Sequence, residues 1–164
     1  MIILSFDVGI KNLAYCQLDS ETKEILDWNV IDCSSDNQIL KLISELDSIP
    51  NLIETDLILI EKQPSFNPKM RIISTAIYVY FTLRINHELN KKIKIIYYSA
   101  KHKLKFCEVK LDKVYKNKYT INKKLAIAQT KILLKDNSFL TFFNSHKKQD
   151  DLADSYLQAL SYIY

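Results

Sequence analysis

The sequence has 164 residues, of which 48% are hydrophobic and 26% are charged, and its formal net charge is +4. This length suits one domain with a real core and excludes two domains of typical size, so we expect a single domain over residues 1–164. No apolar run reaches the roughly 18 residues of a membrane span, and the first residues lack a signal-peptide pattern. We therefore expect no membrane association and a protein that stays in the compartment where it is made.

Three apolar runs open the chain, over residues 2–7, 13–18 and 24–33, with a polar turn at 19–22. They predict three consecutive strands, most simply a meander. Gly9, the only glycine in the sequence, follows the first run. Because a sharp turn beside a binding site needs a positive φ angle or a close backbone approach to a phosphate, we expect Gly9 to provide one of these.

Helices and strands alternate after these strands. Helical spacing of apolar residues predicts a helix over 37–49, and a continuous apolar run predicts a strand over 57–60 that is buried on both faces. Asn67 and Pro68 form a typical helix start, and this helix should run to about Leu89.

The last part of the chain predicts a fifth strand and two helices. The strand covers 94–98, one helix covers 121–134 with its start at Thr120 or Asn122, and the final helix covers 150–163. This order predicts an α/β fold: a mixed five-stranded sheet, built from a three-strand meander and then alternating helices and strands, with helices on both faces. Cys16, Cys33 and Cys107 are widely spaced and indicate free thiols.

Acidic residues stand at the ends of several predicted elements. Asp7 ends the first strand and Glu61 ends the fourth, so they emerge side by side if these strands are parallel neighbours. Asp151 and Asp154 are three residues apart at the start of the last helix and can reach toward one point. Taken singly, each acid also fits a turn, a cap or a solvated loop. Together they favour a shared site neutralised by a divalent cation.

Residues 91–124 form a basic block with twelve lysines against two acidic residues. Such a block is the expected footprint of polyanion binding, because each neutralised phosphate releases counterions. A solvated surface is the simpler explanation for any single lysine, but the block as a whole favours nucleic acid. Aromatic side chains suited to stacking are interleaved with it, namely Tyr97, Tyr98, Phe106, Tyr115 and Tyr119.

Three motifs, in order along the chain, resemble the poxvirus Holliday-junction resolvases. They are Asp7-x-Gly9-x-x-Asn12-x-Ala14, the strand-ending LIxIE with Gln63-Pro64 after it, and Lys-Lys-x-Asp-Asp-x-Ala-Asp-Ser over 147–155. These enzymes are relatives of bacterial RuvC and the fungal mitochondrial resolvases in the RNase H superfamily. The resemblance implies an RNase H-like, dimeric, metal-dependent endonuclease of the host cytoplasm. It would cut four-way DNA junctions symmetrically, leaving 5′-phosphate and 3′-hydroxyl ends, in viral replication, recombination and concatemer resolution.

The resemblance also implies the site residues. The acidic tetrad falls on Asp7, Glu61, Asp151 and Asp154, and a basic residue near the scissile phosphate falls on Lys103, favoured over Lys101. Four carboxylates can hold two Mg²⁺ ions about 4 Å apart, and Mn²⁺ could substitute for them. Because every ligand is an oxygen, magnesium is preferred to zinc. The residues expected to contact DNA are Lys11, Asn12, Lys62, Gln63, Lys69, Lys101, His102, Lys105, Lys147 and Lys148.

This sequence departs from the family pattern in two places. The usual glycine after the basic segment is absent, and the segment from 107 to 122 is longer and richer in lysine than expected. Both departures affect the expected geometry of DNA contact.

The helix that begins at Pro68 is apolar nearly all round between Arg71 and Arg84. Such a helix must be covered on more than one side, so the 68–90 helix is the expected homodimer contact. The predicted contact face lies around Ile73, Ile77 and Tyr80 or Phe81, and burial within one subunit is the alternative. Phe66 and Tyr78 are candidates to meet unstacked bases of the junction.

Three other functions fit parts of the pattern. Another RNase H-superfamily nuclease, for instance one acting on RNA–DNA hybrids, would use the same acids. A non-catalytic DNA-binding dimer would need only the basic block. An actin-like ATPase also begins with Asp-x-Gly, but such folds need further glycine-rich phosphate loops, and the single glycine argues against them.

Overall fold

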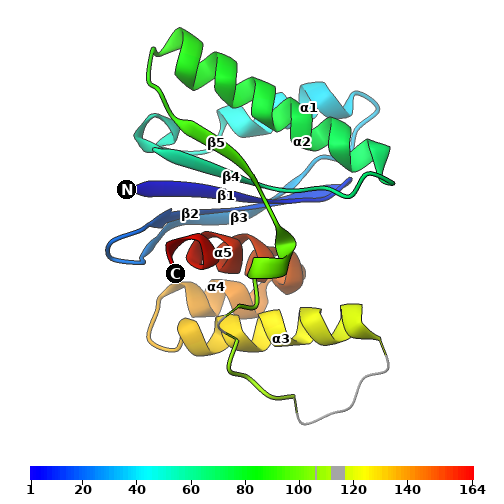
Figure 1. The fold of residues 1–164 in the computed structure, drawn as a ribbon, viewed down its shortest axis with the longest axis vertical. Coiled ribbons are helices and arrows are strands. Elements are labelled where there is room, and N and C mark those ends of the chain that lie inside the picture. Colours follow the sequence, from blue (N-terminus) through cyan, green and yellow to red (C-terminus); the bar gives the residue numbers. More distant parts are fainter. Residues whose placement is uncertain (106, 112–116) are drawn as a thin grey trace.

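The computed structural model describes residues 1–105, 107–111 and 117–164, and Figure 1 shows a central sheet between two layers of helices. The strands are β1 (Ile2–Val8), β2 (Asn12–Asp19), β3 (Ile25–Asp32), β4 (Leu57–Glu61) and β5 (Lys94–Tyr98), in the order β3-β2-β1-β4-β5. The β1–β2 and β2–β3 pairs are antiparallel, whereas the β1–β4 and β4–β5 pairs are parallel. The predicted mixed five-stranded sheet with helices on both faces is therefore confirmed.

Two helices cover one face of the sheet: α1 (Gln38–Asp47) and α2 (Pro68–Phe81). The side chains of Asn37 and Asn67 cap them by accepting backbone N–H groups, and Pro68 occupies the first turn of α2 as expected. Their inner faces bury an apolar core in which the rings of Phe6 and Phe81 lie 5.6 Å apart. A short 3-10 turn, η1 (Leu52–Glu54), connects this layer to β4.

The end of the second helix differs from the prediction. The sequence predicts one regular helix to about Leu89. The α-helix instead ends at Phe81, and the chain continues as the π-helix η2 (Thr82–Glu88). At the junction the Thr82 hydroxyl donates to the carbonyl of Tyr78 (2.8 Å), which gives this carbonyl a hydrogen-bond donor outside the regular helical pattern.

The opposite face is covered by α3 (Lys118–Leu133), α4 (Phe139–Ser145) and α5 (Gln149–Ile163). The Trp28 ring on β3 stacks on Phe143 at 5.3 Å, and its Nε1 donates to the carbonyl of Leu152 (3.1 Å). The ring contact with Phe143 holds α4, a helix that the sequence did not predict, against β3. The predicted start of α3 at Thr120 or Asn122 is also wrong, because Asn117 supplies the cap by accepting the N–H of Tyr119.

The positive φ angle expected of Gly9 is absent, and the alternative, a close backbone approach to a phosphate, stays a prediction. An ideal Cβ placed on Gly9 would lie 2.4 Å from the carbonyl oxygen of Asn12. The two arms of the β1–β2 turn therefore approach each other too closely for any side chain. Glycine is required by the turn that follows Asp7.

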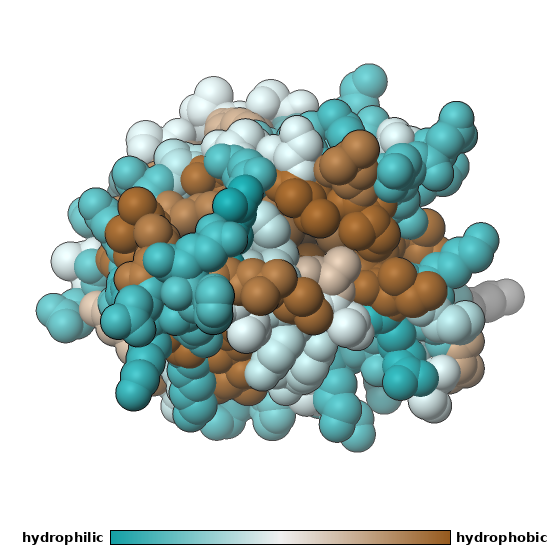
Figure 2. Space-filling model, turned by 90° about the horizontal axis from the view of Figure 1, so that it is seen from above, coloured by the Kyte–Doolittle hydropathy of each residue, from teal (hydrophilic) through white to brown (hydrophobic). Residues whose placement is uncertain are grey.

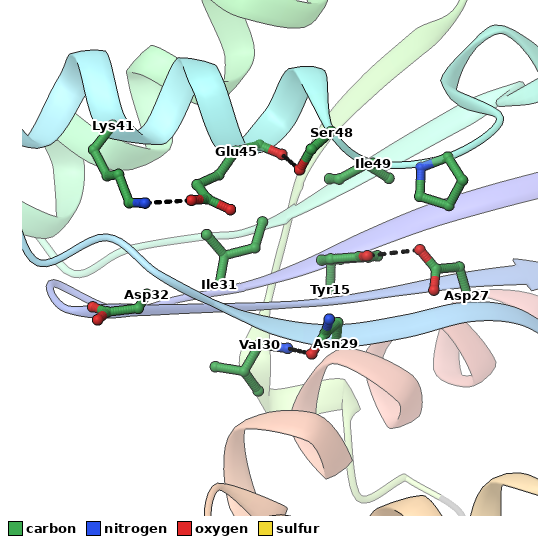
Figure 3. Close-up of a pocket in the computed structure, with 11 residues that line it drawn as sticks. Tyr15, Asp27, Asn29, Val30, Ile31, Asp32, Lys41, Glu45, Ser48 and Ile49 are labelled. Atoms are coloured by element: carbon green, nitrogen blue, oxygen red, sulfur yellow. Dashed lines mark hydrogen bonds and ion pairs between the residues drawn. The ribbon is translucent and has the colours of Figure 1, made fainter.

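The outer strand β3 borders a recess of about 460 Å³ against α1 (Figure 3). Two pairs of side chains interact there: Lys41 forms an ion pair with Glu45 (2.5 Å), and the Tyr15 hydroxyl donates to Asp27 (2.6 Å). Along the same strand, two backbone N–H groups donate to the side chains of the preceding residues, from Trp28 to Asp27 (3.0 Å) and from Val30 to Asn29 (2.8 Å). Their hydrogen-bonding capacity is thus used within β3 itself.

No helix in the described part of the chain is both long and apolar enough to cross a bilayer.

Candidate active site

Two carboxylates lie next to each other at the ends of β1 and β4. The strands are parallel neighbours with Phe6 opposite Ile60, so the residues that follow these two come out at one edge of the sheet. These residues are Asp7 and Glu61. The expected juxtaposition at the carboxyl ends of parallel strands is therefore present.

Lys103 lies directly over these strand ends. After β5, the Ser99 hydroxyl accepts the N–H of Lys101 and starts one 3-10 turn, η3 (Ala100–His102), that brings the chain back across the edge. The Lys103 side chain is buried and only 5% exposed. Its Nζ lies 2.6 Å from Asp7 Oδ1, 2.9 Å from Glu61 Oε1 and 3.4 Å from Asp154 Oδ2. Carboxylates from three remote parts of the chain thus converge on one ammonium group.

Helix α5 supplies the third carboxylate and anchors it. One turn beyond Asp154, the Gln158 amide donates to the Ser5 hydroxyl and to the carbonyl of Phe6, both at 3.0 Å. These bonds hold α5 against β1 immediately before Asp7. Asp151, in the first turn, does not share the Lys103 contact, and its carboxylate lies 3.9 Å from Lys148 Nζ.

Burial sets the electrostatics of this cluster. It raises the pKa of Asp7 well above the ordinary value, and the charges of Glu61 and Asp154 act in the same direction against Lys103. It also raises the pKa of Asp154 and, together with the charge of Asp150, that of Asp151. Burial therefore disfavours the ionised forms of Asp7, Asp151 and Asp154.

The pKa shifts of Glu61 and Lys103 favour the charged form of each side chain, in contrast to the shift of Asp7. Burial opposes the ionised form of Glu61, but Lys103 and the Gln63 amide, which donates at 3.0 Å, lower its pKa. Burial likewise opposes the charge on Lys103, but the three carboxylates outweigh it and raise the pKa. Lys103 consequently stays protonated.

The donor set fits a hard divalent cation in its chemistry, because carboxylate oxygens are the ligands that magnesium prefers. Among the described residues, however, no three His, Cys, Asp or Glu side chains stand in a geometry that could hold a metal ion. The centre on which Asp7, Glu61 and Asp154 converge is taken by the Lys103 ammonium. The charge and the ligand type are thus present, with a lysine at the shared centre.

A cleft of about 590 Å³ opens over the cluster. Five of the residues expected to contact DNA line it, namely Lys11, Asn12, Lys62, Gln63 and Lys148. The other five are exposed but do not line the cleft, namely Lys69, Lys101, His102, Lys105 and Lys147. The cleft is thus acidic at its floor and basic at its rim.

The start of α3 adds cleft residues that the sequence did not assign to the site. Tyr119, Asn122 and Lys123 line the cleft, Lys123 pairs with Asp150, and its Nζ lies 4.8 Å from the centroid of the Tyr119 ring. Recognising the Asn117 cap would have revealed them, because it places these residues in the first turns of α3. Phe106 and Tyr115 of the basic block lie outside the described residues.

The predicted dimer face on α2 is wrong. Ile73, Ile77, Tyr80 and Phe81 are buried in the core of their own subunit, against the sheet. The outer side of the same helix instead carries Ile72 and Val79, and Leu83 follows in η2; these residues are 59%, 48% and 51% exposed. Figure 2, seen from the α2 side, shows apolar side chains gathered on this face between polar ones.

The two aromatic residues proposed to meet bases lie at the surface. Phe66 is 84% exposed in the loop before α2. Tyr78 is partly exposed and stacks on Tyr97 of β5, with ring centroids 5.6 Å apart. Their contact with DNA stays a prediction.

Solved structures share this architecture. The fowlpox virus Holliday junction resolvase is 22% identical, with a TM-score of 0.69 over 99% of this chain and 98% of that one. The same resolvase in a complex with Holliday junction DNA is 24% identical, with a TM-score of 0.66 over 99% and 97%. RuvC of Thermus thermophilus is 13% identical, with a TM-score of 0.65 over 98% and 92%. At these identities the likeness establishes the fold.

Two sequence comparisons concern the family. An uncharacterised protein, L451 of Acanthamoeba polyphaga mimivirus, is 35% identical over an alignment of 136 residues, and the match covers 74% of this chain. The chain spans about a third (33%) of the length of that relative. The model of the family described as poxvirus A22 protein matches residues 1–164. Because this match covers the whole sequence, the chain belongs to the poxvirus A22 protein family.

Proposed function

We propose that this protein is a Holliday-junction resolvase, a divalent-metal-dependent endonuclease that cuts four-way DNA junctions by paired, symmetric incisions. The observation that carries the proposal is the convergence of Asp7, Glu61 and Asp154 on one cationic centre. A lysine-rimmed cleft above this centre suits the phosphate backbone. The fowlpox resolvase of the same fold has been captured with its junction substrate.

Asp7, Glu61, Asp151 and Asp154 would together hold two divalent ions. When bound, magnesium would polarise the phosphate and activate a water molecule for in-line attack. The chain itself positions the reactants: Lys11, Lys62 and Lys148 would neutralise phosphates at the rim. The proposed products are 5′-phosphate and 3′-hydroxyl ends, and the proposed setting is viral DNA replication in the host cytoplasm.

The test is cleavage of a labelled synthetic four-way junction with Mg²⁺, with Mn²⁺ and with EDTA. We expect two symmetric nicks that need a divalent cation, and the Asp7→Asn variant should bind the junction without cutting it. Asymmetric, unpaired nicks would contradict the resolvase function even if nuclease activity appeared. Preferred cleavage of an RNA–DNA hybrid would indicate another nuclease of the superfamily. Junction binding without cleavage under every condition would leave a DNA-binding protein.

We also propose that a second copy of this chain packs on the outer face of α2. Paired incisions need two active sites, and a two-fold contact brings two copies of one surface together. Ile72, Val79 and Leu83 follow helical spacing and form an exposed apolar stripe there. A stripe of this kind is suited to burial against its own copy.

The oligomeric state tests this contact. Val79→Glu should convert a dimer to a monomer in light scattering, because it places a charge in the apolar interface. Ile132→Glu is the matched control, since Ile132 is a similarly exposed residue (60%) on α3. A dimer that survives Val79→Glu and Leu83→Glu would place the interface elsewhere.

A further inference from the structure

The Lys103 ammonium occupies the centre that a divalent cation would need. We propose that Lys103 is an internal counter-ion that holds the acidic cluster together before metal binds, and that the metal must displace it. The inference rests on the proposed metal-dependent function. It adds that the ammonium and the metal compete for the same oxygens of Asp7, Glu61 and Asp154.

Distances support direct competition. Lys103 Nζ lies 2.6 Å from Asp7 Oδ1 and 2.9 Å from Glu61 Oε1, within hydrogen-bond range of both. A magnesium ion would need such oxygens at about 2.0–2.1 Å, which leaves no space for an ammonium group between them. One cation must therefore leave when the other enters.

Burial explains why the free protein needs a counter-ion. The Asp7 and Glu61 side chains are 13% and 16% exposed, so water screens their mutual repulsion poorly. Removing the only ammonium that contacts both, among the described residues, would leave buried carboxylates without compensation. Lys103 thus allows the site to fold before a metal arrives.

The displaced side chain has somewhere to go. Lys103 itself lines the open cleft of about 590 Å³, on a flexible four-carbon stem. The same cleft is rimmed by Lys11, Lys62 and Lys148, where the DNA phosphates are proposed to lie. Metal entry would therefore move one positive charge from the acidic floor toward the substrate.

Metal binding without DNA tests the competition. Titration calorimetry with Mg²⁺, and with Ca²⁺, should show that Lys103→Met binds at least about ten-fold more tightly than the wild type, because the competing cation is gone. Lys135→Met, which removes an exposed lysine that does not line the cleft, should bind like the wild type. Equal or weaker binding by Lys103→Met would overturn the inference. If neither wild type nor variant binds a divalent cation, the metal-dependent function itself fails.

A second measurement uses the wild-type protein and does not depend on how the variant folds. Amine labelling followed by mass spectrometry should find Lys103 protected in EDTA and reactive at saturating Mg²⁺. Lys101, exposed on the same turn, should react in both conditions. A Lys103 that is equally protected, or equally reactive, with and without Mg²⁺ would show that the metal does not displace it.

Discussion

The two helical layers differ in what they bury against the same sheet. The α1 and α2 layer meets the sheet through an apolar core that includes Phe6, Ile77 and Phe81. The α5 layer also buries polar groups against the sheet, and Gln158, Ser155 and Ser161 are 0–4% exposed. Only the α5 layer contributes carboxylates to the cluster at the strand ends. The difference indicates that the α5 layer, and not the α1 and α2 layer, orients the carboxylate that joins the strand ends.

Hydrogen bonding gives the α5 layer its precision. The Gln158 amide binds Ser5 and Phe6 on β1, and the Tyr98 hydroxyl on β5 donates to the carbonyl of Ser161 (2.9 Å). Apolar packing alone tolerates small shifts, whereas directional bonds fix one register of helix against strand. The acids that must meet at one point therefore lie on the elements that these bonds hold.

The largest effect should come from the acids that the α5 layer and the sheet bring together. Asp154→Asn or Glu61→Gln should lower the rate of junction cleavage roughly 10³-fold or more, because several kcal/mol of charge stabilisation would be lost. Junction affinity should stay near that of the wild type in a gel-shift assay. Asp136→Asn, an exposed carboxylate between α3 and α4, is the control. If Asp154→Asn cleaves at the wild-type rate, Asp154 is not part of the active site.

Removing one buried aromatic ring from each helical layer distinguishes an effect on stability from an effect on the geometry of the site. Phe143→Ala and Phe81→Ala should each lower the free energy of unfolding by about 3–5 kcal/mol, since both rings are fully buried. Only Phe143→Ala should also weaken magnesium binding, because it loosens the support of α5 through Trp28. Urea denaturation and calorimetry measure the two effects. Equal loss of magnesium affinity in both variants would mean that the layers are not independent.

A smaller effect is expected in the turn between β1 and β2. Gly9→Ala should cost about 1–3 kcal/mol in the free energy of unfolding, because the new methyl group overlaps the Asn12 carbonyl. Ile10→Ala, at a partly exposed neighbour, serves as the comparison in the same urea experiment. If Gly9→Ala is as stable as the wild type, the turn has room to relax.

The smallest effect is expected on the surface of the α1 layer. Lys41→Met removes an exposed i,i+4 ion pair with Glu45 and should leave the urea midpoint unchanged within error. The contrast with buried Lys103 is informative, because both lysines pair with carboxylates at similar distances. A clear loss of stability in Lys41→Met would show that the Lys41–Glu45 pair stabilises the fold more than an exposed ion pair normally does.

The strands were predictable because each is a compact apolar run with a clear end. The ends of β1 and β4 then followed from the topology of a mixed sheet, which is why Asp7 and Glu61 could be placed together. Short α4 was not predictable from periodicity, because its aromatic residues are arranged around Trp28, more than a hundred residues earlier in the chain.

The rest of the site depends on tertiary contacts that spacing does not encode. An all-round apolar helix gives no sign of which side faces the sheet, and the inner and outer faces of α2 were therefore exchanged. Lys103 was chosen from several neighbouring lysines, but its burial among three carboxylates follows from the turn of η3 after β5. Tyr119 and Lys123 reach the cleft only because α3 begins at the Asn117 cap.

The outer strand β3 limits how copies of the protein can assemble. Asp27 and Asn29 satisfy the N–H groups of Trp28 and Val30, so these donors are not available to template a strand from another molecule. Open-ended polymerisation through this border of the sheet is thereby discouraged. The contact that we propose lies instead on a helical surface, where a two-fold contact closes on itself after two copies.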